Sequence, residues 1–278
     1  MYRNIKIKPF DRNKYREIRD QIREKKLNTV CMEANCPNRY ECFSQGTATF
    51  MILGDICTRN CRYCNVRKGV PKRPNPEEPR IIRETIEKMN LNYAVITCVT
   101  RDDLEDGGAG HFCEVVKEIR KIPGCKIELL ISDLDGNFDA LKRIVNSRPD
   151  VLNHNIEVVR DLFPKLRPKG SYELSLEILK RAKMESPELF TKSGFMVGLG
   201  ETRKQIFATL RELLENQCNM VTIGQYLQPS SAHAKIEKFY TDQEFLELKT
   251  IALRMGFDGV ESGVLVRSSY HAKDMVRH

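Results

Sequence analysis

The sequence predicts an α/β fold in which six strand–helix units, (β/α)6, form a partial barrel. Continuous apolar strands alternate with amphipathic helices along residues 47–258, which is the pattern of a parallel sheet covered by helices. Right-handed crossovers wind such a chain into a barrel or a doubly wound sheet. A complete eight-unit barrel typically takes about 250 residues, so this shorter stretch favours six units and a partial barrel.

Six segments predict the strands, because each is short, apolar and rich in β-branched residues. The first, TATFMILGDI, follows a glycine and runs into a cysteine-rich loop. The second, YAVITCV, is apolar throughout, as expected for a strand that is buried on both faces. In chain order, the predicted strands are residues 47–56, 93–99, 126–132, 150–157, 192–200 and 220–228.

A segment with helical periodicity follows each predicted strand. The first of these, PEEPRIIRETIEKMN, opens with prolines and acids and places Ile82, Ile86 and Met89 on one face. The last opens with Thr241 and carries Glu244 three residues later, which is the pattern of a capping box. The predicted helices are residues 76–90, 111–122, 137–147, 171–184, 202–216 and 241–256.

Composition limits the class of protein. The chain has 278 residues, of which 41% are hydrophobic and 30% charged, as is usual for a folded globular protein. No apolar run approaches the roughly 18 residues of a membrane span, and the N-terminus, MYRNIKIKPFDRNKYREIRD, has neither the apolar core nor the cleavage site of a secretory signal. The net charge of +8 is spread along the chain. We therefore expect a cytoplasmic protein with no membrane and no nucleic-acid partner.

Ten cysteines are unusual for this length, and six of them lie between residues 31 and 64. In a reducing compartment, such a group indicates metal binding rather than disulfides. Cys57, Cys61 and Cys64 form the pattern CxxxCxxC directly after the first predicted strand, at the end where parallel α/β folds carry their active sites. Three thiolates on one loop suit an iron–sulfur cluster with one open iron. Structural zinc is the alternative, but it prefers paired CxxC elements and four ligands.

Cys31, Cys36 and Cys42 form a second triplet, CxxxxCxxxxxC, upstream of the first strand. This loose spacing fits neither a zinc knuckle nor a ferredoxin motif. It predicts a second cluster beside the barrel mouth, and an ordinary segment with free thiols is the alternative. Residues 1–46 are accordingly expected to form an N-terminal extension that carries this triplet.

The first triplet, with Tyr63 before its last cysteine, resembles the motif of the radical S-adenosylmethionine (SAM) enzymes. The order of the two triplets resembles lipoyl synthases, and the resemblance extends from Cys31 to Ala272 through TRDDLEDGGAGHF, HNIE, SGFMVGLGE, IGQYLQPS and VRSSYHA. It implies a barrel of the radical SAM type, with SAM and two [4Fe–4S] clusters as cofactors. The implied reaction inserts sulfur at C6 and C8 of an octanoyl group on a carrier-protein lysine, with sulfur donated by the auxiliary cluster.

The resemblance also implies roles for single residues. The SAM-bound cluster would be held by Cys57, Cys61 and Cys64. The auxiliary cluster would be held by Cys31, Cys36, Cys42 and Ser269 of the RSSY motif. This role of Ser269 implies that residues 259–278 form a C-terminal segment that closes over the barrel mouth. The expected SAM contacts are Tyr63, Asp102, Asn155, Glu157 and Gly198. The polar residues in this last set have another explanation, because such side chains also cap loops and strand ends.

The implied partners are octanoylated lipoyl carrier domains, namely E2 subunits of 2-oxoacid dehydrogenases and the H protein of glycine cleavage. An electron donor such as ferredoxin or flavodoxin and an iron–sulfur carrier that rebuilds the auxiliary cluster are also implied. Two other functions stay open. A biotin synthase relative would share CxxxCxxC but should lack the upstream triplet and RSSY. A basic zinc protein that binds nucleic acid would contain no acid-labile sulfide.

Overall fold

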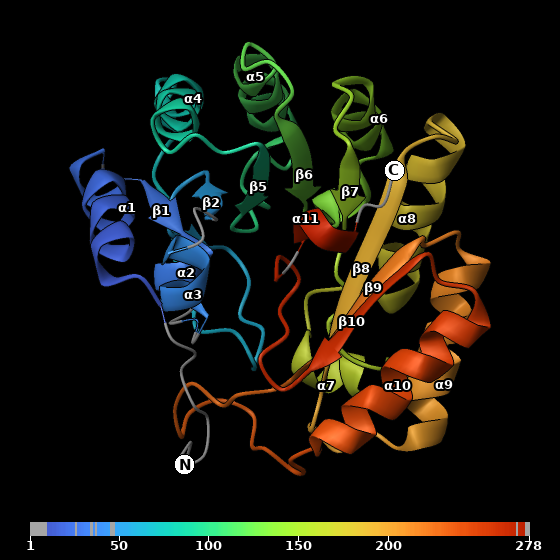
Figure 1. Ribbon diagram of the computed structural model, residues 1–278. Coiled ribbons are helices and arrows are strands. Elements are labelled where there is room, and N and C mark those ends of the chain that lie inside the picture. Colours follow the sequence, from blue (N-terminus) through green and yellow to red (C-terminus); the bar gives the residue numbers. More distant parts are fainter. Residues whose placement is uncertain are drawn as a thin grey trace.

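A computed structural model describes residues 10–25, 27–33, 36, 38–44, 48–270 and 272–275. Its centre is one curved sheet of eight strands, with helices along its outer face (Figure 1). Neighbouring strands from β2 to β10 are parallel, and β1 pairs with β2 in the antiparallel sense. The order across the sheet is β1 (Asn28–Thr29), β2 (Thr49–Ile52), β5 (Tyr93–Cys98), β6 (Lys126–Leu130), β7 (Val151–Asn153), β8 (Phe190–Val197), β9 (Met220–Gln225) and β10 (Gly259–Gly263).

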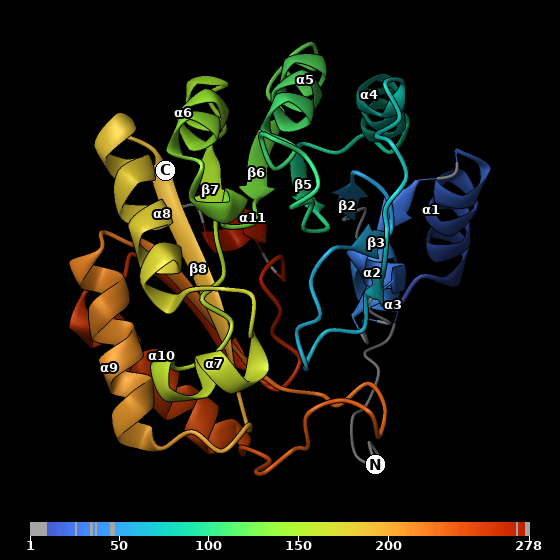
Figure 2. The ribbon, with the colours of Figure 1, turned by 180° about the vertical axis from the view of Figure 1, so that it is seen from behind.

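Helices cover the convex side of this sheet, as the view from behind shows (Figure 2). Two of them begin with the capping boxes Thr202/Gln205 and Thr241/Glu244, in which side chain and backbone donors are satisfied reciprocally. The longer helices are α1 (Arg12–Glu24), α4 (Glu78–Lys88), α5 (Ala109–Ile119), α6 (Phe138–Asn146), α8 (Tyr172–Glu185), α9 (Arg203–Glu215) and α10 (Asp242–Met255). The short ones are α2 (Val30–Glu33), α3 (Arg39–Ser44), α7 (Phe163–Leu166) and α11 (Ala272–Met275).

The six strand–helix units and the partial barrel are confirmed, since the sheet order is linear and leaves β1 and β10 as edges. Several features differ from the expectation. The strand expected over 47–56 ends at Ile52, because Leu53 and Gly54 have φ values of 68° and 93°. Residues 259–263 form β10, another parallel strand beside β9, and the short β1 was not foreseen. The strand expected over 150–157 ends at Asn153, because Glu157 has a φ of 70° and makes only an isolated bridge to Phe195. The boundary expected between residues 46 and 47 lies outside the described residues.

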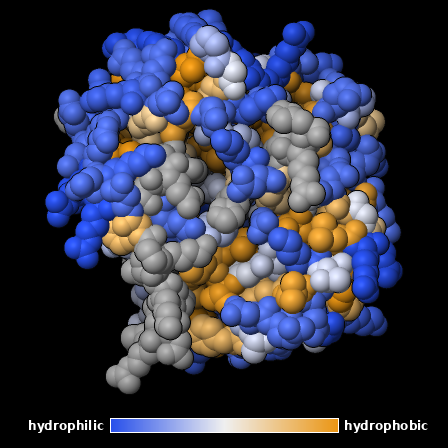
Figure 3. Space-filling view, viewed as in Figure 1, coloured by the Kyte–Doolittle hydropathy of each residue, from blue (hydrophilic) through white to orange (hydrophobic). Residues whose placement is uncertain are grey.

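The two faces of the sheet differ in chemistry. Outward residues such as Ile96 and Leu129 are fully buried against the helices in an apolar core. The inner face carries polar residues, including Thr97, Glu128 and Lys192, that are also buried. Hydrophobic residues gather in the lower half of the face in Figure 3, toward the side where the strands end. Among the helices of the described ranges, none is long and apolar enough to cross a membrane.

The C-terminal segment crosses the inner face of the sheet. Ala272 of α11 packs with Tyr93 and Val95 of β5, and Met275 packs with residues of β7 and β9. In Figure 1 the short red helix α11 lies inside the arc of strands. The segment that precedes it lies between the barrel strands and the N-terminal helices. On one side Leu265 and Tyr270 hydrogen-bond Asn38 and Glu41. On the other side Ser268 and Ser269 hydrogen-bond Asn155 and Thr49.

Candidate active site at the carboxyl ends of the strands

The loop with the first cysteine triplet is folded back on itself. Cys57 lies in β3 (Ile56–Cys57), which pairs with β4 (Arg67–Lys68) and so closes the loop at its base. The backbone N–H of Gly69 donates to the carbonyl of Cys57 at 3.1 Å, and that of Cys64 donates to the carbonyl of Cys61 at 3.2 Å. The loop follows β2, as predicted, at the carboxyl edge of the sheet.

The three thiols of this loop interact with one another. Burial raises the pKa of Cys64 to about 12, with smaller contributions from Cys61 and Cys57. Burial also raises the pKa of Cys61, while the nearby Arg167 guanidinium acts in the opposite direction. Cys61 and Cys64 are therefore protonated at neutral pH in the metal-free chain. Binding of iron must release these protons, because only thiolates are metal ligands.

In the second triplet, Cys31 lies on α2, Cys42 lies on α3, and Cys36 lies between these two helices. Burial raises the pKa of Cys31 to about 12, and the charge of Cys36 adds to the effect. Burial also raises the pKa of Cys42, followed by the influence of Cys31 and Cys36. The backbone N–H of Cys36 donates to the carbonyl of Cys31 at 3.1 Å. The thiols of this triplet thus influence one another, and their binding of a cluster stays a prediction.

Ser269 lies beside the second triplet. The Thr49 hydroxyl donates to the Ser269 hydroxyl at 2.8 Å, and Thr49 also hydrogen-bonds Cys31. The Tyr270 hydroxyl, next in the chain, donates to Glu41 of α3 at 3.2 Å. Ser268 faces elsewhere, since its hydroxyl accepts from the Asn155 amide at 2.6 Å. The two serines therefore serve different sides of the site, and Ser269 is the one near the second triplet.

Asn155 and Glu157 follow β7 at the inner rim. The Asn155 amide donates to Glu157 Oε1 at 3.2 Å, while its own Oδ1 is buried without a hydrogen-bond partner among the described residues. Burial raises the pKa of Glu157, and it also raises that of Tyr63, to which Glu157 contributes next. These three predicted SAM contacts are thus near one another, and their contact with SAM stays a prediction.

Gly198 has a structural reason to be glycine. Its φ is 100°, and a Cβ at this position would overlap Gln225 and lie 2.5 Å from the carbonyl of Lys238. The Glu201 carboxylate accepts from the backbone N–H groups of Gly198 and Leu199 at 2.7 and 2.8 Å. This close packing fixes the turn after β8, and the SAM contact expected for Gly198 stays a prediction.

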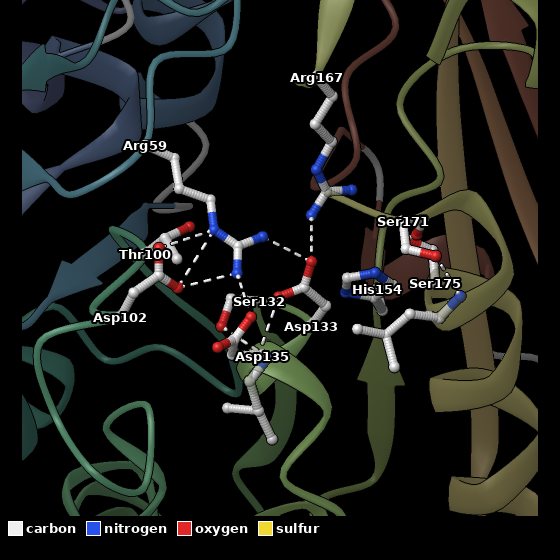
Figure 4. A network of polar contacts seen from close by, with 12 residues as sticks. Arg59, Thr100, Asp102, Ser132, Asp133, Asp135, His154, Arg167, Ser171 and Ser175 are labelled. Carbon is white, nitrogen blue, oxygen red and sulfur yellow. Dashed lines mark hydrogen bonds and ion pairs between the residues drawn. The ribbon is translucent and has the colours of Figure 1, made fainter. Parts of the chain in front are cut away.

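Sequence reasoning missed a buried ionic network at the same edge (Figure 4). Arg59 lies between Cys57 and Cys61 and is 3% exposed. Its guanidinium binds Asp102 after β5 at 2.8 Å and Asp133 after β6 at 2.6 Å. Asp102, expected to contact SAM, is therefore occupied with Arg59. The only sequence signal was one arginine between two cysteines, which by itself is an ordinary surface residue.

Arg167 extends this network to α7. Its guanidinium lies 3.4 Å from the Asp133 carboxylate and donates to the Asn155 carbonyl at 3.3 Å. Burial would lower the pKa of Arg167, but neighbours that include Tyr63 and Asp133 reverse this and raise it. His154 is buried beside the network, with its Nδ1 3.0 Å from the Ile131 carbonyl.

The donor chemistry of both triplets fits iron–sulfur clusters. Within the described ranges, no three Cys, His, Asp or Glu side chains are drawn tightly enough together to hold one metal ion. A cubane cluster makes a different demand, because its ligands bind different corners and do not converge on a point. Each triplet supplies three thiols with no histidine, which suits a cluster better than a closed zinc site. The other four cysteines, Cys98, Cys113, Cys125 and Cys218, are buried or half-buried.

The chain is similar in sequence to known proteins. Residues 51–213 match the family model of the radical SAM superfamily. The chain is 52% identical over 274 residues to the lipoyl synthase of Halalkalibacterium halodurans, covering 98% of this chain and 90% of that protein. It is 50% identical over 274 residues to the lipoyl synthase of Bacillus subtilis, covering 98% and 92%.

Solved structures share the fold. The FeFe-hydrogenase maturase HydG from Carboxydothermus hydrogenoformans aligns with a TM-score of 0.62 and 16% identity. The alignment covers 76% of this chain and 52% of that one. At this level of identity, the similarity concerns the partial barrel alone.

Proposed function

The chain belongs to the lipoyl synthase family of radical SAM enzymes, and from this we propose the reaction and the residues that perform it. The enzyme inserts two sulfur atoms, at C6 and then at C8, into an octanoyl chain. That chain is carried as an amide on a lysine of a lipoyl carrier domain. One observation carries the proposal: the thiols of each triplet influence one another, and a serine from the far end of the chain lies beside the second triplet.

Family membership gives the enzyme one [4Fe–4S] cluster and SAM as cofactors. We assign that cluster to Cys57, Cys61 and Cys64, and a second, auxiliary cluster to the other triplet with Ser269. When bound, the first cluster supplies the electron that cleaves SAM, and the auxiliary cluster supplies the sulfur. The chain's own part is to position these groups and to exclude water from the reacting carbon.

Several residues of the inner rim would hold SAM. Asn155 offers a buried oxygen without a partner among the described residues, and Glu157 lies next to it. Tyr63 lies close to Glu157 and Arg167. Gly198 would contact SAM through its backbone, in a turn where Gln225 and Lys238 leave no room for a Cβ. Asp102 acts through Arg59, to which it is bound.

Ser269 would supply an oxygen ligand to the auxiliary cluster. To do so, its hydroxyl must exchange the hydrogen bond from Thr49 for iron. An oxygen is a harder ligand than a thiolate and should be lost more easily from iron. Such a ligand suits a cluster that is consumed as it gives up sulfur.

The partners follow from the proposed reaction. Octanoylated E2 subunits of 2-oxoacid dehydrogenases and the H protein of glycine cleavage present the substrate. A ferredoxin or flavodoxin delivers electrons, and an iron–sulfur carrier rebuilds the auxiliary cluster after turnover. We place the enzyme in the cytoplasm, because its cluster ligands must stay reduced.

Anaerobic iron and sulfide counts, combined with SAM cleavage, test the assignment. The reconstituted chain should hold about eight irons, since two cubane clusters hold four each. Alanine at Cys57, Cys61 and Cys64 should remove about half of the iron and abolish 5′-deoxyadenosine formation. Alanine in the other triplet should also remove about half, yet leave SAM cleavage intact and form no lipoyl product.

Cys113→Ala is the matched control, because this half-buried cysteine lies on α5 outside both triplets. It should retain all the iron and both activities. The assignment is wrong if the first triple variant still makes 5′-deoxyadenosine. A zinc-containing, colourless protein without acid-labile sulfide would instead contradict both clusters at once.

A further inference from the structure

We propose that Arg59 is a positioning residue that fixes the first cysteine loop and tunes the cluster it holds, an inference that rests on the proposed function. Arg59 is two residues from both Cys57 and Cys61 in the sequence. Its side chain nevertheless turns away from the loop and into the ends of the barrel strands (Figure 4). The loop is thereby tied to the scaffold at its middle as well as at its base.

The anchor consists of carboxylates from two neighbouring loops. Arg59 Nε donates to Asp102 Oδ2 at 2.9 Å and Nη2 donates to Asp102 Oδ1 at 2.8 Å, which is a two-point contact. Nη1 donates to Asp133 Oδ2 at 2.6 Å. A planar guanidinium suits this arrangement, because its donors point in fixed directions and can hold two carboxylates at once.

Burial makes the anchor rigid. Asp133 is 1% exposed, so its charge depends on Arg59 and on Arg167, whose guanidinium lies 3.4 Å away. Burial would raise the pKa of Asp133, but Arg59 outweighs it and the pKa is lowered. Asp135 adds a weaker contact at 3.7 Å from the solvent side. A buried carboxylate held in this way cannot leave Arg59 without losing a counter-charge.

The anchored residue also touches a cluster ligand. The backbone N–H of Arg59 donates to the Cys57 sulfur at 3.4 Å. Hydrogen bonds to cluster sulfurs and nearby charge are among the factors that set the reduction potential of an iron–sulfur cluster. Because the side chain fixes the position of residue 59, it also fixes this N–H relative to the sulfur. Arg59 therefore influences the cluster by geometry and by charge.

If Arg59 had a purely structural role, its loss would destabilise the chain, but the direction of any change in the reduction potential of the cluster would not depend on the charge removed. The midpoint reduction potential of the cluster therefore distinguishes a structural role from the proposed tuning role. In cluster-loaded enzyme, the spectrum of the reduced cluster with SAM bound is followed during a redox titration. Arg59→Gln removes a cation and should make the midpoint potential more negative. Asp133→Asn removes an anion and should shift it in the opposite direction, although both changes disturb the same network.

SAM cleavage gives the second readout. Arg59→Gln should lower 5′-deoxyadenosine formation at least tenfold, and Arg59→Lys should restore part of it because charge returns without the two-point contact. Arg62→Gln is the matched control. Arg62 belongs to the same loop and its exposed side chain has no partner within the part of the chain that the structure describes. The control should resemble the unaltered enzyme in both readouts.

The inference is overturned if Arg59→Gln matches Arg62→Gln, or if Arg59→Gln and Asp133→Asn shift the potential in the same direction. If Arg59→Gln does not fold, the midpoint potentials and SAM cleavage of Asp133→Asn and Arg59→Lys are compared with those of Arg62→Gln instead. The proposed function fails separately, namely if the unaltered, cluster-loaded chain cleaves no SAM.

Discussion

Lys192 and Glu128 form an ion pair inside the barrel, and breaking it should destabilise the fold strongly. Both side chains are 0% exposed, and the Lys192 ammonium lies 3.0 Å from the Glu128 carboxylate. The pair reaches from β8 to β6 across β7. Glu128 also accepts from the Tyr93 hydroxyl at 2.8 Å and the Asn153 amide at 2.9 Å. Lys192→Met would leave the carboxylate with these two neutral donors only.

The expected magnitude follows from this environment. Removing one partner of a buried pair typically costs about 3–5 kcal/mol, because the remaining charge is uncompensated. The two retained hydrogen bonds favour the lower end, so we expect about 3 kcal/mol. Adding Glu128→Gln removes the stranded charge and keeps a polar group for Tyr93 and Asn153. The double variant should therefore be more stable than Lys192→Met, by at least about 1.5 kcal/mol.

These differences are measured as shifts of the urea midpoint of unfolding, monitored by circular dichroism under anaerobic conditions on proteins with equal cluster content. Lys249→Met is the matched control. Its ion pair with Glu261 has a similar distance, 3.1 Å, but is partly exposed, so the loss should stay below about 1 kcal/mol. The reasoning is refuted if the double variant is no more stable than Lys192→Met, or if Lys192→Met costs no more than the control.

Three further predictions concern single residues. Ser269→Ala should keep SAM cleavage but lose lipoyl formation, measured in an anaerobic single turnover, and normal product would exclude Ser269 as a necessary ligand. Gly198→Ala should destabilise the chain by about 1–3 kcal/mol in the same urea assay, because its φ is positive and Gln225 occupies the space. An unchanged midpoint would contradict that packing. Burial lowers the pKa of His154 to about 4, below its usual value of about 6.5. Between these values the unfolded chain binds more protons, so stability present above pH 6.5 should fall as the pH drops toward 4, by up to about 3 kcal/mol. In the folded chain Asp133, Arg167 and Arg59 face the His154 ring. His154→Gln should reduce the dependence of the unfolding free energy on pH between about 4 and 6.5. An equal dependence in the variant and the unaltered chain would show that His154 is not its cause.

Much of the fold was predictable because its signals are local. The predicted strand 93–99 and the helix opened by Thr241 appear almost as expected, since continuous apolar runs and capping boxes are read over a few residues. The strand expected over 150–157 was too long, because polar residues and the positive φ of Glu157 interrupt an apolar pattern. The strand β10 was missed because GVESG carries little apolar signal and gains its place by pairing with β9.

The candidate site also contains parts that the sequence predicted and parts that it did not. The two cysteine triplets stand out through spacing alone, and in the structure the thiols within each triplet influence one another's pKa. The Arg59 network could not be foreseen, because Asp102 and Asp133 are brought to Arg59 by the parallel order of β2, β5 and β6. Ser269 came from resemblance only. Ser269 lies next to Thr49 only because the C-terminal segment crosses the inner face of the sheet, and short sequence patterns contain no signal for that path.

The most direct test of the central claim is the origin of the inserted sulfur. The chain is reconstituted with iron and heavy-isotope sulfide and then allowed one anaerobic turnover on an octanoylated carrier peptide, without any other sulfur source. The account predicts lipoyl product with two heavy sulfur atoms, at most one product per chain, and loss of iron from the triplet of Cys31, Cys36 and Cys42. Lipoyl product with unlabelled sulfur, or several products per chain with that cluster intact, would contradict it.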